Sequence, residues 1–270
     1  GGGGGGEEDQ QAIIEQSDYR FLYLGPQGTR TGLHADVLRS YSWSVNISGR
    51  KKWYLLPPRY THYCYDTFGR NLAPSFFDVD EETYPNIKHA RKHLVEVTQD
   101  SGEAIFVPSG WHHTVENVQD TLSINHNWFN VCNIHYAWEL LQRERHEAEQ
   151  AICDCRAMCA TEAEFELLVQ RNVAANASMN YNHFARLLLM IAGERGKRLA
   201  GLGAAAAEEV PGSEADGGIS IAALMPAYET KMAHTILSQL VDKVTDENVR
   251  GDIEQSMEEL SAALPHVNFK

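Results

Sequence analysis

The sequence predicts a mainly β domain, an antiparallel sandwich or barrel, followed by a helical region. Short apolar segments of strand-like composition recur between residues 19 and 129, and Gly, Pro and Ser separate them. Closely spaced strands with such turns are typical of antiparallel sandwiches and barrels. After Asn133, apolar residues recur at helical spacing instead. We therefore divide the chain into three parts, residues 1–17, 18–133 and 134–270.

Five segments carry the strand prediction, because each is rich in β-branched and aromatic residues. They are residues 19–24, 42–47, 52–56, 104–107 and 122–128. Residues 59–95 lie between the third and fourth of them and contain several Tyr and Phe without a regular pattern. We expect a long irregular loop there, and such loops are often functional.

The third part shows helical patterns separated by small polar residues. They cover residues 136–158, 162–169, 182–192, 227–243 and 253–264. Residues 201–218 are rich in Ala, Gly, Glu and Ser, so we expect a mobile linker. Residues 1–17 open with six Gly and several acidic or amide residues, and we expect a disordered leader that buries nothing.

Composition excludes several classes of function. A formal net charge of -14 argues against direct, sequence-independent binding to nucleic acid and suits a basic partner better. No run reaches the roughly 18 apolar residues that span a bilayer. Five cysteines, an odd number, argue against a disulfide framework, so we expect reduced thiols in the cytosol or nucleus. Cys153, Cys155 and Cys159 fit helix thiols better than zinc ligands, because only the last two share a helical face.

The segment Thr31-Gly-Leu-His-Ala-Asp36 places an imidazole and a carboxylate two positions apart. On an extended chain, both side chains project to the same side and could share one metal ion. The pattern is weak by itself, because chance often supplies a His and an Asp at this spacing.

The segment Phe106-Val-Pro-Ser-Gly-Trp-His-His113 predicts a strand, a tight turn and a second strand that begins with histidines. A third ligand from this strand would complete two imidazoles and one carboxylate, with coordination positions left open. That set suits non-haem Fe(II) oxygenases. His112 and His113 face opposite sides of a strand, so only one of them can be the ligand.

The segment Gly49-Arg-Lys-Lys-Trp53 follows an apolar strand. A lysine that faces inward is costly to bury unless an anion meets it, so Lys51 or Lys52 either points to solvent or binds a carboxylate. An exposed basic turn explains this segment equally well when it is considered alone. The presence of all three segments in this order favours the anion site.

Together these segments resemble the jumonji-C family of 2-oxoglutarate oxygenases, and the likeness spans Asp18 to about Asn130. The resemblance rests on Thr-Gly-Leu-His-Ala-Asp, Gly-Arg-Lys-Lys-Trp, Phe-Val-Pro-Ser-Gly-Trp-His-His and Ser-Ile-Asn-His-Asn-Trp, in family order. It implies a double-stranded β-helix, which is a jelly-roll barrel of the cupin type. It also implies bound Fe(II), 2-oxoglutarate as cosubstrate, and O2.

The resemblance implies roles for individual residues. The family's metal triad matches His34, Asp36 and His113, which makes His112 a packing neighbour. The positions that contact the cosubstrate match Lys51, Thr31, Asn125 and Asn127. Lys51 and Thr31 match the groups that bind the distal carboxylate of 2-oxoglutarate, and Ser44 is a further candidate.

The resemblance favours hydroxylation of a lysine side-chain carbon in a translation termination (release) factor, and an acidic protein suits a basic substrate. N-methyl-lysine demethylation uses the same iron chemistry at a different carbon and remains an alternative. A catalytically silent barrel that serves as a binding module is another, because fold alone does not define function. A cupin with another metal would leave Lys51 and Thr31 unexplained.

The segment before the first ligand is short, since 33 residues precede His34 and the first ten are Gly-rich or acidic. Family members place a longer segment there that covers the barrel. We therefore expect a barrel without some N-terminal elements, with apolar side chains exposed on a sheet.

Overall fold

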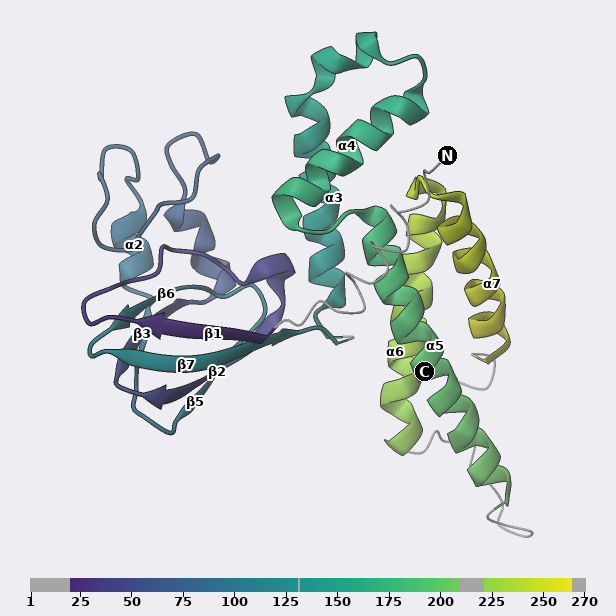
Figure 1. The fold of residues 1–270 in the computed structure, drawn as a ribbon, viewed down its shortest axis with the longest axis horizontal. Helices are drawn as coiled ribbons and strands as arrows, with labels where there is room; N and C mark the ends of the chain where they lie inside the picture. The colour runs from purple at the N-terminus through teal and green to yellow at the C-terminus, as the bar shows by residue number, and fades with distance from the viewer. Residues whose placement is uncertain (1–19, 131, 209–220, 264–270) are drawn as a thin grey trace, which may run out of the picture. The chain divides into compact units, whose positions relative to one another are not determined.

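The computed structural model describes residues 20–130, 132–208 and 221–263. The chain divides into two compact units at the boundary between Phe129 and Asn130. The first unit is built from strands and the second from helices (Figure 1).

The first unit contains two antiparallel sheets, one of four strands in the order β1-β7-β2-β5 and one of three in the order β4-β3-β6. The strands are β1 (Arg20–Gly25), β2 (Tyr41–Ser48), β3 (Lys51–Leu56), β4 (Val95–Gln99), β5 (Ala104–Val107), β6 (His112–Asn117) and β7 (Thr121–Trp128). The connections carry the 3-10 helices η1 (Val37–Arg39) and η2 (Pro58–Cys64) and the helix α2 (Ile87–Arg91). The predicted antiparallel β architecture is confirmed.

The segment that we expected to be an irregular loop, residues 59–95, is more ordered than predicted. It contains most of η2 and all of α2, and β4 begins at its end. Its apolar side chains pack with the outer face of β3 in one hydrophobic cluster, whose fully buried members include Leu56, Phe76 and Ile87. The inner face of β3 contributes Trp53 and Leu55 to a second cluster between the sheets, with Val107 and Val115. Most of the aromatic residues of this loop therefore pack in a core.

The four-stranded sheet has an inverted pattern, with its polar face inside. Along β2, Ser42, Ser44 and Asn46 are buried, whereas the alternating Trp43, Val45 and Ile47 face outward. The neighbouring β7 follows the same rule, since Thr121, Ser123 and Asn127 are buried. Side chains alternate between the faces of a strand, so both strands present their polar side chains to the interior. An interior lined in this way can bind a polar ligand.

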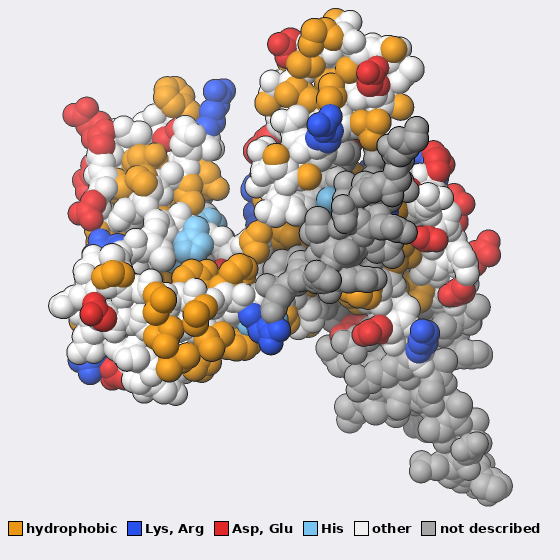
Figure 2. Space-filling view, in the orientation of Figure 1, with side chains coloured by type: hydrophobic (Ala, Val, Ile, Leu, Met, Phe, Trp, Pro, Cys, Tyr) orange, Lys and Arg blue, Asp and Glu red, His pale blue; other side chains and the backbone are white. Residues whose placement is uncertain are grey.

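The outer face of the same sheet is apolar and exposed, and Figure 2 shows hydrophobic side chains gathered over it. Leu22 on β1 lies opposite Ile124 on β7, and both are exposed. Tyr41, Phe106 and Trp128 form an aromatic cluster on this face, with ring centroids 5.5 to 5.9 Å apart. Contiguous exposed apolar side chains of this kind can mark an interaction surface.

The second unit is helical, as predicted. Its elements are α3 (Ile134–Ala151), η3 (Cys153–Met158), α4 (Glu162–Ala177), α5 (Tyr181–Glu208), α6 (Ile221–Leu240), η4 (Val241–Lys243) and α7 (Glu247–Ala263). Helix α5 packs against α6 and α7, and α3 packs against α4. No helix within the described ranges has an apolar stretch long enough to cross a membrane.

Two predicted segments fall partly or wholly outside the described residues. Helix α5 extends to Glu208 and so includes the first part of the predicted linker, residues 201–218. The remainder of that linker lies outside the described residues, as does the predicted leader, residues 1–17.

Candidate metal centre

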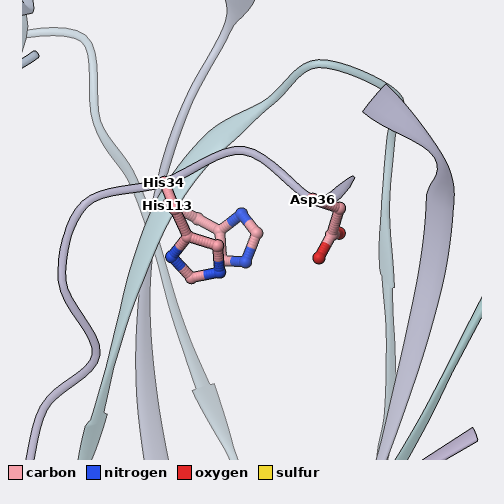
Figure 3. A group of neighbouring side chains, drawn as sticks. All are labelled: His34, Asp36 and His113. Carbon is pink, nitrogen blue, oxygen red and sulfur yellow. The ribbon is translucent and has the colours of Figure 1, made fainter. Parts of the chain in front are cut away.

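Three potential metal ligands lie together in the β-rich unit: His34, Asp36 and His113. One ligand atom from each lies within 4.8 Å of the others, and no second group of this kind occurs among the described residues. Figure 3 shows the two imidazoles next to each other and the carboxylate facing them across a gap. Their exposure differs, because His34 is exposed, Asp36 is partly buried and His113 is buried.

Backbone pairing brings the two histidines together. His34 forms an isolated antiparallel bridge with His113 at the start of β6. The amide of His34 donates to the carbonyl of His113 over 3.1 Å, and the amide of His113 donates back over 2.7 Å. Arg30 and His34 thus pair with β6 through isolated bridges, to Glu116 and His113, and not as part of a named strand. Asp36 follows two residues later, immediately before η1.

The structure also separates the two adjacent histidines of β6. His113 lies with His34, and their ring centroids are 4.3 Å apart. The ring of His112 lies near Thr61, with 3.3 Å between its Nδ1 and the threonine Oγ1. Burial lowers the pKa of His112 to about 4, so its imidazole is neutral. Adjacent side chains of a strand face opposite ways, so His112 lies on the other side of β6 from the three potential ligands.

Hydrogen bonds fix which nitrogen of each imidazole is available to a metal ion. Nδ1 of His34 lies 2.8 Å from the carbonyl oxygen of Gly32, and Nδ1 of His113 lies 3.0 Å from that of Trp111. A carbonyl only accepts, so each Nδ1 carries the hydrogen and each Nε2 keeps its lone pair. Burial and the nearby His34 lower the pKa of His113, which favours the neutral form that binds metals.

The carboxylate of Asp36 has its own partner, which the sequence patterns did not identify. The hydroxyl of Ser42 on β2 donates to Oδ2 of Asp36 over 2.6 Å. Ser42 belongs to the predicted strand 42–47, but nothing in the pattern of that strand indicated a contact with Asp36.

The three residues line a cavity of about 480 Å³ inside the β-rich unit. β1 contributes the aromatic side chains of Phe21 and Tyr23 to its wall. All four residues that the sequence associated with the cosubstrate line it as well: Lys51, Thr31, Asn125 and Asn127. Asp36 is the one carboxylate among the described lining residues.

The two adjacent lysines of β3 face opposite ways. Lys51 is 6% exposed, and its ammonium donates to the hydroxyl of Ser123 over 2.5 Å. Burial lowers the pKa of Lys51, because the charged form loses hydration. Lys52 points outward and forms an ion pair with Glu96 at 2.9 Å. Lys51 is therefore the lysine that a ligand in the cavity would meet.

The other polar lining residues differ in how far their hydrogen bonds are satisfied. Thr31 accepts a bond from the amide of Val115 over 2.9 Å, which leaves its hydroxyl hydrogen free to donate. Asn127 donates to the hydroxyl of Ser40 over 2.9 Å. Oδ1 of Asn125 is buried without a hydrogen-bonding partner among the described residues, and buried polar atoms usually have partners, so a ligand in the cavity can supply the missing one. Oγ of Ser44 also has no partner among the described residues, but Ser44 does not line the cavity.

The donor set defines the chemistry that this site can support. Two imidazole nitrogens and one carboxylate oxygen can occupy three positions around a six-coordinate ion and leave the others open. The interior is polar, and Lys51 can neutralise an anion. These features fit a redox-active divalent metal together with an anionic ligand. The fold and site together fit the class of cupin-type proteins in which two histidines and one carboxylate could hold a metal ion.

Comparison with known proteins gives the same class. Residues 7–134 match the model of the cupin-like domain family. An Arabidopsis thaliana protein named arginine-specific demethylase JMJ20 is 48% identical over 172 residues, which are 63% of this chain and 36% of that protein. The zebrafish (Danio rerio) and human (Homo sapiens) proteins named 2-oxoglutarate and iron-dependent oxygenase JMJD4 are 44% and 39% identical. These matches cover 67% and 74% of this chain, and 43% and 46% of those proteins.

Over residues 7–134 the chain is therefore similar to cupin-like domains, and it is similar to relatives of the jumonji-C type. The predicted resemblance is confirmed at the level of this family. The chain spans less than half the length of the relatives described above.

Proposed function

We propose that this chain carries the catalytic site of an Fe(II)- and 2-oxoglutarate-dependent protein oxygenase. The buried ammonium of Lys51 is the observation that carries the proposal, because it shares a cavity with the triad and has a hydroxyl, not an acid, as its partner. A buried charge without a counter-ion is costly, so such a site is suited to an anionic ligand. The zebrafish and human relatives are named 2-oxoglutarate and iron-dependent oxygenases, which supports iron as the metal and 2-oxoglutarate as the anionic ligand.

Each residue has a distinct task in this proposal. His34, Asp36 and His113 would hold Fe(II), which supplies the chemistry that couples decarboxylation of 2-oxoglutarate to oxidation of a C–H bond by O2. Lys51 would pair with the distal carboxylate, and Thr31 would donate its hydroxyl hydrogen to the same group. The carbonyl oxygen of Asn125 has no partner within the described part of the chain, so it could accept a hydrogen bond from a donor in the cavity. The apolar wall at Phe21 would exclude water.

For the substrate, we propose a lysine side chain in a translation termination factor, hydroxylated at a carbon. The sequence resemblance and the net charge of -14 support a basic protein substrate. N-methyl-lysine demethylation is the second candidate. The Arabidopsis relative is named a demethylase, which supports this type of reaction, although its name specifies arginine. Both reactions begin with oxidation of a C–H bond, so the same site could perform either. We place the reaction in the cytosol or nucleus, where the five free cysteines would stay reduced.

Turnover assays on the purified chain test the proposal. Fe(II), 2-oxoglutarate and peptides from a termination factor, unmodified or N-methylated, are added, and succinate and peptide mass are measured. Hydroxylation adds one oxygen atom to the peptide, and demethylation removes one methyl group. A chain that binds neither Mn(II) nor 2-oxoglutarate would instead be a silent binding module, and the oxygenase proposal would be wrong.

A further inference from the structure

Each potential ligand of the centre is held by one hydrogen bond from outside the triad. The partners of His34 and His113 are backbone carbonyls, whereas the partner of Asp36 is the side chain of Ser42. We propose that Ser42 is a positioning residue, which holds the Asp36 carboxylate so that one of its oxygens binds the metal. This inference rests on the proposed metal site.

Asp36 needs such support because its backbone lies outside both sheets. It precedes η1, a short turn in which Leu38 and Arg39 have φ values of 52° and 54°. Residues with side chains rarely adopt this left-handed conformation, and each instance stores conformational strain. The turn is closed by an amide of Arg39 that donates to the carbonyl of Asp36. A carboxylate on a strained turn could rotate unless its side chain is also held.

Ser42, in contrast to Asp36, lies on a strand that is paired on both sides. It lies on β2, between β7 and β5, and its Cα is paired with Asn127 on one side and Val107 on the other. Its side chain is buried but reaches the cavity. A hydroxyl has one hydrogen to donate, and Ser42 gives it to Oδ2 of Asp36. Oδ1 then remains for the metal, which favours coordination through a single oxygen and keeps a further position open.

The same strand offers a matched control. Ser44 faces the interior two positions further along β2 and is fully buried. Its hydroxyl has no hydrogen-bonding partner among the described residues. Removal of this hydroxyl deletes a buried polar group of the same kind but leaves the bond to Asp36 intact.

The test measures Mn(II) affinity without cosubstrate, from the electron paramagnetic resonance signal of free Mn(II). Ser42→Ala should raise the Kd for Mn(II) about tenfold or more, the usual effect of losing an outer partner of a metal ligand. Ser44→Ala should bind Mn(II) like the wild type. Ser42→Thr and Ser42→Val have nearly the same shape, so threonine should preserve the affinity and valine should lose it. Comparison of the threonine and valine variants therefore shows whether the hydroxyl supports metal binding, even if the alanine variant folds poorly.

The absorption spectrum of bound Co(II) gives a readout that does not depend on turnover. Ser42→Val should change the d–d bands, because the carboxylate can then bind through both oxygens, whereas Ser42→Thr should keep the wild-type spectrum. Equal affinities and spectra for the threonine and valine variants would overturn the role of Ser42 while the metal site stands. Failure of the wild type to bind Mn(II) or Co(II) would overturn the metal site as well.

Discussion

His34 and His113 are paired both through their backbones and through their rings. Two backbone hydrogen bonds of 3.1 and 2.7 Å link the residues, and the ring centroids lie 4.3 Å apart. The distance between the two imidazoles is therefore fixed by sheet-like pairing before any metal arrives. Preorganised ligands lose little entropy on binding, so this geometry favours tight metal binding.

The first prediction concerns the triad. Single substitutions His34→Ala, Asp36→Ala and His113→Ala should each abolish measurable Mn(II) binding and turnover, because two ligands hold a divalent ion poorly. His112→Ala is the matched control and should bind Mn(II) like the wild type, since its ring faces Thr61. Isothermal titration calorimetry provides the measurement. Loss of binding in His112→Ala with retention in His113→Ala would reverse the assignment.

A second prediction concerns the cosubstrate. Lys51→Met should weaken 2-oxoglutarate binding by about 2 kcal/mol or more, roughly 30-fold, because a carboxylate loses its buried cation. Lys52→Met removes an outward-facing lysine paired with Glu96 and should leave binding unchanged. The apparent KM for 2-oxoglutarate and the thermal shift on its addition both report this difference. An unchanged KM in Lys51→Met would mean that another group binds the distal carboxylate.

The exposed face of the four-stranded sheet leads to a third prediction. Leu22→Thr combined with Ile124→Thr should lower binding of the dye ANS and reduce aggregation, because both residues contribute to this apolar surface. Threonine suits a strand, and substitutions at exposed sites usually change stability by at most about 0.5 kcal/mol each. Leu55→Ala provides the contrast, since loss of a buried leucine costs about 2–5 kcal/mol. Unchanged dye binding in the double variant would show that ANS binds elsewhere.

Alkaline pH provides a fourth prediction through Cys64. Burial raises the pKa of this thiol to about 12 from an ordinary value near 9.0. Above pH 9 the unfolded state releases the thiol proton, whereas the folded state keeps it. The free energy of unfolding is therefore unaffected by this thiol below pH 9 and decreases between pH 9 and 12. Between pH 8 and 10 the free energy of unfolding of the wild type should fall by about 1 kcal/mol more than that of Cys64→Ala. Urea unfolding at both pH values measures the difference, and parallel losses in the two proteins would contradict it.

Most of the fold followed from local patterns, because turn residues and strand propensity act over a few neighbours. The predicted strands 42–47, 52–56, 104–107 and 122–128 correspond to β2, β3, β5 and β7 within a residue at each end. β4 was not predicted as a strand. It is an edge strand whose residues are mostly exposed, so it lacks the apolar alternation that marks a buried strand.

Spacing and family resemblance contributed differently to the predicted site. Two-residue spacing suggested that His34 and Asp36 could share a metal, and strand parity implied that only one of the two adjacent histidines could join them. The choice of His113 over His112, and of Lys51 over Lys52, came from the family resemblance. The contact of Ser42 with Asp36 could not be predicted, because the connection between the two residues passes through Leu38 and Arg39, which have left-handed backbone conformations. Neither Leu nor Arg favours that conformation, so no local propensity indicates the turn.

The position of β1 has a consequence for how the cavity opens. Among the described strands β1 pairs only with β7, yet Phe21 and Tyr23 on this strand form part of the cavity wall. Edge strands with exposed hydrogen bonds undergo local unfolding more readily than central ones. β1, like β5, lies at an edge of this sheet, so its amides should exchange with solvent sooner than those of the central strands β2 and β7. A ligand that contacts Tyr23 would slow that exchange. Access to the cavity through this wall would then depend on fraying of β1, without any movement of β2 and β7, which carry the polar interior.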